Sequence, residues 1–185
     1  MGLRQRLMAL TYDRVMAGYE GHAGPRRAEL LAGLEGRVVE LGPGTGVNLE
    51  HLPADVEWHG VEPSEPMRAA LLDRWKGLRS DAPSFVGLEN GYVHLPTAFA
   101  DVVLATLVLC SVPDLAHTLR EVRRILRPGG RFVFLEHVAA PGGTWTRRLQ
   151  GIATPLWRHL ADGCRLDRDT GAAIHAAGFE RVELE

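Results

Sequence analysis

Short apolar runs alternate along the chain with segments whose apolar residues recur at helical spacing. An apolar run of about four to eight residues between turn residues is typical of a buried strand. Strands separated by helices in this way indicate an α/β domain. The runs predict six strands, at residues 37–39, 56–62, 84–89, 101–110, 131–138 and 179–185.

Three segments between the strands have the signals of helices. Ser64 can cap a helix whose apolar residues share one face up to Leu78, and a second helix has its apolar face between Leu115 and Leu126. Near the carboxyl end, Asp167 can cap a third helix that closes at Gly178. These helices lie where crossover connections between parallel strands are expected.

Composition and charge narrow the class of protein. The chain has 185 residues, of which 45% are hydrophobic and 24% charged, with a net charge of −2, so it fits one globular domain without a charge signal for nucleic acid. The longest apolar run, 102–112, contains Thr106 and Ser111 and is much shorter than the roughly 20 residues of a membrane span. The first ten residues lack the apolar core of a signal peptide, so we interpret the protein as cytoplasmic.

The two cysteines fit a reducing compartment and predict no metal site. Cys110 and Cys164 are not part of a CxxC motif, and the histidines have no paired ligand spacing. The simplest interpretation of each cysteine is a small buried apolar residue.

The segment "VVELGPGTGVNLEHLP", residues 38–53, places Gly42, Gly44 and Gly46 at every second position after a predicted strand. A strand, a glycine turn and a helix start at Val47 are typical of a nucleotide site, because glycine lets the backbone approach a ligand closely. A P-loop requires lysine after its last glycine, and the GxGxxG dinucleotide loop requires a third glycine. Val47 stands at both of those positions, so neither motif is present.

Two carboxylates indicate which ligand the glycine loop binds. Glu40, two residues before the first glycine, would repel a pyrophosphate but attract the ammonium and sulfonium of S-adenosylmethionine. Glu62, at the end of the second strand, can accept hydrogen bonds from both ribose hydroxyls. The position of Glu62 also suits NAD, which leaves an NAD oxidoreductase as an alternative.

Three segments, "VVELGPGTG", "VEPSEPM" and "LREVRRILRPGGRFVFLEH", resemble the class I S-adenosylmethionine-dependent methyltransferases, in the same order across most of the chain. The resemblance implies a doubly wound, mostly parallel Rossmann-like sheet with helices on both faces. It implies one domain over 1–185, with an N-terminal helical segment at 1–36 and a substrate-side insertion at 139–166, which is rich in Trp, Gly and Pro. S-adenosylmethionine is then the methyl donor, and S-adenosylhomocysteine is the product.

The same resemblance implies which residues contact the cofactor. It places the loop around the methionine part, Glu62 on the ribose, and the segment after the third strand on adenine. Many members have Asp-Ala-Glu shortly before Leu-Pro in that last segment, where this chain has Gly91, Tyr92 and Val93. The implied cofactor-binding residues are Glu40, Gly42, Gly44, Gly46, Glu62, Leu88, Glu89, Asn90, Thr106 and Leu107.

A narrower resemblance concerns the acceptor. The segments "TLVLCSV", "LEHV" and "DGCRL", with Trp145 and Trp157, are similar to the alkyl thiol methyltransferases of the methyltransferase-like group. Better known members of that group carry an amino-terminal membrane anchor, which this sequence lacks. The resemblance implies an alkyl thiol as acceptor. The alternatives are an amine, hydroxyl or carbon of a lipid, quinone or natural product, or a module that binds S-adenosylmethionine without turnover.

The acceptor-side residues follow from the same resemblance, because ligands of open α/β sheets bind at the carboxyl ends of the strands. His137 is the candidate for a base or a thiolate-stabilising cation, with Asp162 second. A structural histidine and a turn residue are the alternatives for these two positions. The implied substrate residues are Cys110, Trp145, Trp157 and Cys164, with core packing as the alternative for both tryptophans.

The family topology also includes a seventh strand, antiparallel and inserted between the fifth and sixth. Only "ERVELE" follows Phe179, so the residues for this strand are missing from the chain. Either the chain is a shortened version of a longer protein, or another segment covers the edge at 131–138. In the first case, residues 179–185 are expected to be frayed or displaced.

Overall fold

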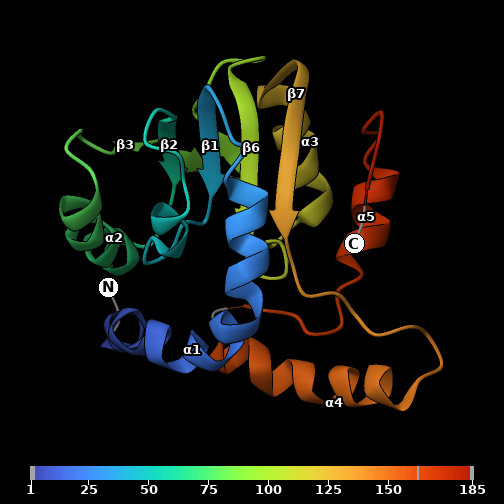
Figure 1. Cartoon of the computed structure of the whole chain (residues 1–185). Coiled ribbons are helices and arrows are strands. Elements are labelled where there is room, and N and C mark those ends of the chain that lie inside the picture. Colours follow the sequence, from blue (N-terminus) through green and yellow to red (C-terminus); the bar gives the residue numbers. More distant parts are fainter. Residues whose placement is uncertain (1–2, 162, 184–185) are drawn as a thin grey trace.

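The computed structural model describes residues 3–161 and 163–183. Figure 1 shows a twisted sheet whose strand order is β3-β2-β1-β6-β7, and every pair in it is parallel. This order confirms the mostly parallel α/β sheet that the sequence predicts. Its strands are β1 (Arg37–Leu41), β2 (Glu57–Val61), β3 (Ser84–Phe85), β6 (Ala100–Thr106) and β7 (Leu126–Leu135).

Helices cover both faces of the sheet, as expected for a doubly wound domain. Val39 and Val103 pack in a core with residues of α3 (Leu115–Ile125) and α5 (Thr170–Ala176). The neighbouring Val38 and Val102 pack on the opposite face, with residues of α1 (Leu3–Leu31) and α2 (Glu65–Leu78). A strand that is buried on both faces needs apolar residues at successive positions, which explains the continuous apolar runs.

The strand predicted at 101–110 is shorter than its apolar run. β6 ends at Thr106, and the next residue, Leu107, has a left-handed backbone with a φ of 55°. Leu109 and Cys110 are nevertheless buried. The residues after the end of β6 are therefore apolar because they form a turn that is buried in the core, and not because they belong to the strand.

Residues 84–89 form parts of two sheets instead of one strand. Only β3 joins the main sheet, whereas β4 (Leu88–Glu89) pairs antiparallel with β5 (Tyr92–Val93). The two residues between them, Asn90 and Gly91, have φ values of 50° and 82°. Asn-Gly is a preferred pair for such a two-residue hairpin turn, because both positions need a positive φ.

The carboxyl-terminal segment differs from the strand predicted at 179–185. Residues 179–183 form no strand, and the last two residues lie outside the described part. Phe179 instead stacks on Phe132 of β7, with ring centroids 5.5 Å apart, and Val182 packs against the same core. Within the described residues, β7 pairs with β6 alone, and the antiparallel strand that the family topology adds to this sheet is not present. The apolar residues of this segment thus cover the face of the sheet and do not extend its edge.

Two further elements differ from the expectation. The helix expected from Val47 is a single 3-10 turn, η1 (Val47–Glu50). The cap of α5 is Asp169, two residues after the predicted Asp167, and its carboxylate accepts a hydrogen bond from the Ala172 backbone N–H.

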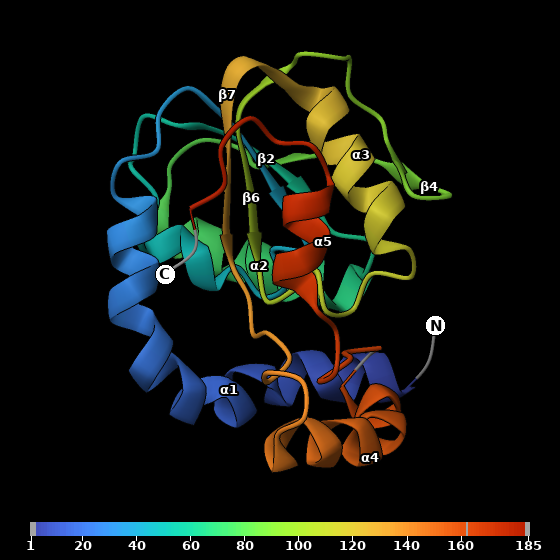
Figure 2. The same cartoon turned by 90° about the vertical axis from the view of Figure 1, so that its right-hand side faces the viewer.

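The irregular stretch at 139–166 contains a helix, α4 (Trp145–Leu160), which Thr144 caps by accepting a hydrogen bond from the Arg147 backbone N–H. Figures 1 and 2 show α4 and the first half of α1 side by side across the carboxyl ends of the strands. The last turns of α1 run beside the sheet, and Pro25 lies within this helix, where proline kinks a helical backbone. No described helix has the length and apolarity that crossing a membrane requires.

Gly60 in β2 determines where the ring of Trp58 lies, because a Cβ at this position would be 2.2 Å from that ring. We expect Gly60→Ala to displace the ring and its hydrogen bond to Glu40, at a cost of about 1–3 kcal/mol in the free energy of unfolding. Urea denaturation measures this loss.

Gly21→Ala is the matched control, because Gly21 lies in α1 and a Cβ at this position would have no neighbouring atom within 4 Å. It should be neutral or stabilise the protein by up to about 1 kcal/mol. An equal loss in both variants would contradict the steric explanation.

Candidate functional site

A cavity of about 1490 Å³ opens at the carboxyl ends of the strands, between the sheet and the helices α1 and α4. Open α/β sheets bind their ligands at this edge. The volume exceeds the roughly 300–1,000 Å³ of a typical pocket for one small ligand, so two molecules fit side by side. Loops after β1, β2, β6 and β7 contribute to its wall, among them Gly44, Glu62, Thr106, Cys110 and His137.

The glycines after β1 serve different purposes. Gly42 and Gly44 have left-handed φ values of 58° and 57°. A Cβ at Gly42 would lie 2.4 Å from the side chain of Val108, so this glycine permits close packing between two loops. At Gly44 no atom lies within 4 Å of such a Cβ, and the residue lines the cavity, which leaves space for a ligand against the backbone. Gly46 packs against Leu49 and does not line the cavity.

Glu62 holds the glycine loop from the end of β2. Its Oε2 accepts a hydrogen bond from the Gly44 backbone N–H at 3.0 Å, and its Oε1 accepts one from the Ser64 backbone N–H at 2.8 Å. A carboxylate oxygen has two lone pairs, so Glu62 can accept further hydrogen bonds from a ligand in the cavity. The backbone contacts fix the carboxylate for that purpose.

Glu40 is buried behind the cavity wall. Its Oε2 accepts a hydrogen bond from Trp58 Nε1 at 2.7 Å, and its Oε1 accepts one from Asn48 Nδ2 at 2.6 Å. Burial raises the pKa of Glu40, against the opposing effects of these two hydrogen bonds and of the Arg27 charge. The sequence predicts direct contact between Glu40 and the ligand, whereas in the structure Asn48 lines the cavity and Glu40 does not.

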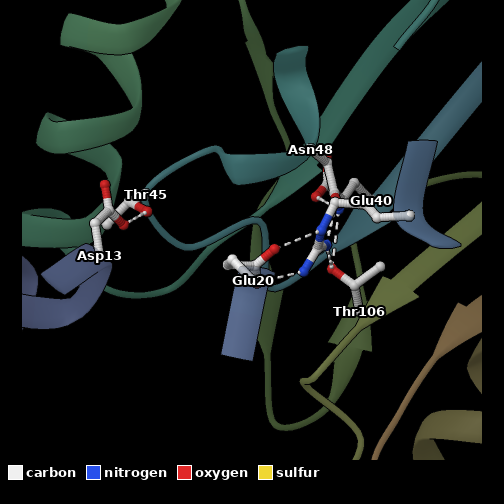
Figure 3. A network of polar contacts seen from close by, with 7 residues as sticks. Asp13, Glu20, Glu40, Thr45, Asn48 and Thr106 are labelled. Atoms are coloured by element: carbon white, nitrogen blue, oxygen red, sulfur yellow. Dashed lines mark hydrogen bonds and ion pairs between the residues drawn. The ribbon is translucent and has the colours of Figure 1, made fainter. Parts of the chain in front are cut away.

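The sequence analysis missed a buried cation at this end of the cavity. Arg27 is 2% exposed, pairs with Glu20 at 2.7 Å, and donates hydrogen bonds to Thr106 Oγ1 at 3.0 Å and to Asn48 Oδ1. Figure 3 shows Glu20, Asn48 and Thr106 converging from three elements. Two of these partners are 21 and 79 residues away in the chain, so no local pattern identifies Arg27. Asn48 could have been identified from the sequence, because it is a polar residue two positions after Gly46, the last glycine of the loop.

Asp13 fixes the first half of α1 over the glycine loop. Its Oδ1 accepts a hydrogen bond from Thr45 Oγ1 at 2.7 Å, as Figure 3 shows, and its Oδ2 pairs with Arg74 of α2 at 2.6 Å. Asp13 thus joins α1 to the glycine loop and α2, and Arg27 joins it to η1 and the end of β6, so the helix forms one wall of the cavity.

Sulfur and imidazole groups form the opposite end of the cavity. Cys164 Sγ lies 3.6 Å from His137 Nε2, and Cys110 lines the same region. Hydrogen bonds with Cys110 and with His137 lower the pKa of the Cys164 thiol to about 5, whereas the hydrogen bond with Cys164 and burial raise that of Cys110. The pKa of His137 is raised, chiefly by its hydrogen bond with Cys164. This end therefore favours a thiolate next to an imidazolium.

Comparison with known proteins identifies the family. A family model described as "Methyltransferase domain" matches residues 12–184. The chain belongs to this methyltransferase family. The human thiol S-methyltransferase TMT1B is 37% identical over 159 residues, which cover 84% of this methyltransferase and 65% of the human protein. The chain thus spans slightly less than two thirds of that relative.

Solved structures confirm the methyltransferase fold. A chain from the complex between the Haloferax volcanii Trm112 methyltransferase activator and a putative methyltransferase has a TM-score of 0.70 at 22% identity, covering 94% of this chain and 75% of that one. DhpI, solved as a complex with SAM and HEP, has a TM-score of 0.60 at 28% identity, covering 80% and 67%. These matches confirm the predicted Rossmann-like architecture.

The cavity of this methyltransferase contains most of the predicted site residues. Four of them do not line it: Glu40, Gly46, Glu89 and Trp145. Trp145 is 69% exposed on α4, and Asp162 lies outside the described residues. The predicted residues that do line the cavity are Gly42, Gly44, Glu62, Leu88, Asn90, Thr106, Leu107, Cys110, His137, Trp157 and Cys164.

We expect Arg27→Leu to lower the free energy of unfolding by at least about 2 kcal/mol, because Glu20, Asn48 and Thr106 lose their shared donor. Urea denaturation measures the change. Lys76→Leu is the control, because its pair with Asp73 lies on the exposed surface of α2 and contributes at most about 1 kcal/mol. Equal effects of both substitutions would show that the buried network does not depend on Arg27.

Proposed function

We propose that this protein transfers the methyl group of S-adenosylmethionine to the sulfur of a small alkyl thiol. The observation that carries the proposal is one cavity that joins the Gly44 and Glu62 end to the Cys110, His137 and Cys164 end. A cofactor and an acceptor can meet in such a cavity. The similarity to a thiol S-methyltransferase supports sulfur as the acceptor atom.

Residues at the glycine end have the chemistry that S-adenosylmethionine requires. We assign Glu62 to the ribose hydroxyls, Leu88 and Asn90 to the adenine, and the backbone of Gly44 to the methionine part. Arg27 lines the same end, and its positive charge attracts the carboxylate of the methionine part. When bound, S-adenosylmethionine supplies a methyl group that its sulfonium already activates.

At the other end, the chain has to orient a sulfur nucleophile and favour its ionised form. We assign His137 as the base or as the cation beside the thiolate, with its imidazole on the cavity wall. The acceptor loses its thiol proton to His137 or to solvent, and the sulfur electron pair forms the new bond to the methyl carbon. Trp157 and Leu166 offer apolar surface for an alkyl chain. The role of Asp162 stays a prediction.

A cytoplasmic location is part of this proposal. Cys110 and Cys164 are both free cysteines, and a reducing compartment keeps closely spaced thiols from forming a disulfide. The proposed reaction involves two small molecules and requires no nucleic acid.

Glu62→Ala should weaken S-adenosylmethionine binding by about 1.5–3 kcal/mol, the range for hydrogen bonds to a charged group. Isothermal titration calorimetry measures the affinity. Glu65→Ala, three residues later on the exposed first turn of α2, is the control and should retain the wild-type affinity. Unchanged binding by the Glu62 variant would remove this carboxylate from the cofactor site.

Thiols should be the preferred acceptors in a panel containing an alkyl thiol, hydrogen sulfide, a primary amine and a phenol. A thiol with a pKa of about 8.5 is partly ionised at neutral pH and needs less activation than the others. Transfer of a labelled methyl group, resolved by mass spectrometry, identifies the product. Amine or phenol methylation without thiol turnover would favour another acceptor class, and cofactor binding without any product would indicate a binding module.

A further inference from the structure

Three potential metal ligands converge at the acceptor end of the cavity, although their spacing in the sequence gives no such signal. Cys110 follows β6, His137 follows β7, and Cys164 follows α4. Their Sγ and imidazole nitrogen atoms all lie within 4.8 Å of one another. Among the described residues, no other His, Cys, Asp and Glu side chains form such a group. The sequence predicts no metal site, because the three residues meet only in the folded chain.

The separation of Cys164 and His137 matches that of two ligands in a tetrahedral zinc site. Zinc binds thiolate sulfur at about 2.3 Å and imidazole nitrogen at about 2.0–2.1 Å, so tetrahedral geometry places a sulfur and a nitrogen ligand about 3.6 Å apart. The distance from Cys164 Sγ to His137 Nε2 is 3.6 Å. Two thiolates and an imidazole favour zinc over magnesium or calcium, which prefer oxygen ligands.

The surrounding backbone holds the three ligands in place. The Arg165 backbone N–H donates to the carbonyl oxygen of Cys110 at 3.1 Å, which joins the segment after α4 to the loop after β6. Arg168 strengthens this junction by donating to the carbonyl oxygens of Leu109 and Val112 at 2.6 and 2.7 Å. The backbone N–H of Ala139, two residues after His137, donates to the carbonyl oxygen of Arg168 at 3.2 Å, which joins the segment after β7 to the same junction.

We propose that Cys110, His137 and Cys164 bind one zinc ion and leave its fourth coordination position open to the cavity. Three protein ligands with an open position are the arrangement of catalytic zinc sites, whereas structural sites have four. All three side chains line the cavity, so the open position faces the space for the acceptor. Zinc binding releases the remaining thiol protons of Cys110 and Cys164 to solvent.

The identity of the fourth ligand rests on the proposed function. An acceptor thiol binds there as its thiolate, its S–H bond breaks, and the proton passes to solvent. The sulfur keeps its electron pair for the methyl group. In this arrangement the metal replaces His137 as the cation beside the thiolate, solvent takes the proton, and His137 acts as a ligand.

Metal titration of the reduced full chain tests the site without any methyl donor. Cobalt(II) serves as the spectroscopic probe, because thiolate ligation and tetrahedral geometry give it characteristic absorption. We expect about one equivalent of cobalt to bind per chain and zinc to displace it. Absence of stoichiometric binding, or an octahedral cobalt spectrum, would overturn the proposal.

Substitution identifies the ligands. Cys110→Ser, Cys164→Ser and His137→Ala should each weaken zinc binding by more than the roughly 10–100-fold lost when only an outer-shell partner is removed. His22→Ala, on the exposed surface of α1, is the control and should bind as the wild type does. Equal binding by all four variants would assign the metal to another place.

A second measurement does not depend on how well the variants fold. In the wild-type protein, zinc should slow the reaction of Cys110 and Cys164 with a thiol reagent, and a chelator should restore the rate. If zinc leaves these reaction rates unchanged, the two thiols are not its ligands and the proposal is wrong.

Adding an alkyl thiol to the cobalt-loaded protein should shift the cobalt spectrum, whereas the corresponding alcohol should not. If cobalt binds but its spectrum does not shift, the thiol is not the fourth ligand, whereas the assignment of the three protein ligands is unaffected. Failure of the methyltransferase assay with an intact cobalt site would reject the proposed function alone.

Discussion

The burial of Arg27 is the constraint on which the cavity depends. Removing a guanidinium from water costs several kcal/mol, so the arrangement is stable only when its partners are all in place. Those partners come from α1 itself, from η1 and from the end of β6. Asn48 extends the network to Glu40, which in turn holds Trp58 of β2. The position of α1 over the strand ends therefore follows from linked polar contacts as well as from apolar packing.

The central strands could be predicted because burial on both faces leaves a continuous apolar run. Val38 and Val39 show this, since they are adjacent in β1 and pack in different cores. The same reasoning fails at Leu109 and at Phe179, which are packed against the core without belonging to a strand. A continuous apolar run indicates that its residues are buried. It does not show which of their backbone groups form the hydrogen bonds of a sheet.

The residues of the cavity could not all be predicted from the sequence. The positions of Gly44 and Glu62 in the cavity wall could be predicted because their geometry is set by a short strand-turn unit. The hairpin turn at Asn90 had a local signal too, in the Asn-Gly pair. Arg27 had none, because its partners join distant parts of the chain. The meeting of His137 and Cys164, 27 residues apart, likewise arises only when the sheet brings separate loops to one edge.

The acceptor end is built with fewer buried contacts than the cofactor end. Among the side chains of α4 that the structure describes, Thr154 alone is buried, whereas Leu149, Ile152 and Leu156 are exposed. Elements with few buried contacts open at a lower free-energy cost than core strands. Because α4 carries Trp157 and leads to Cys164, its movement would open the acceptor end, whereas the Arg27 network holds α1 at the other end. This asymmetry suits the proposed reaction, because an apolar acceptor and its methylated product can exchange at the α4 side, while S-adenosylhomocysteine, formed in each turnover, leaves from the other end.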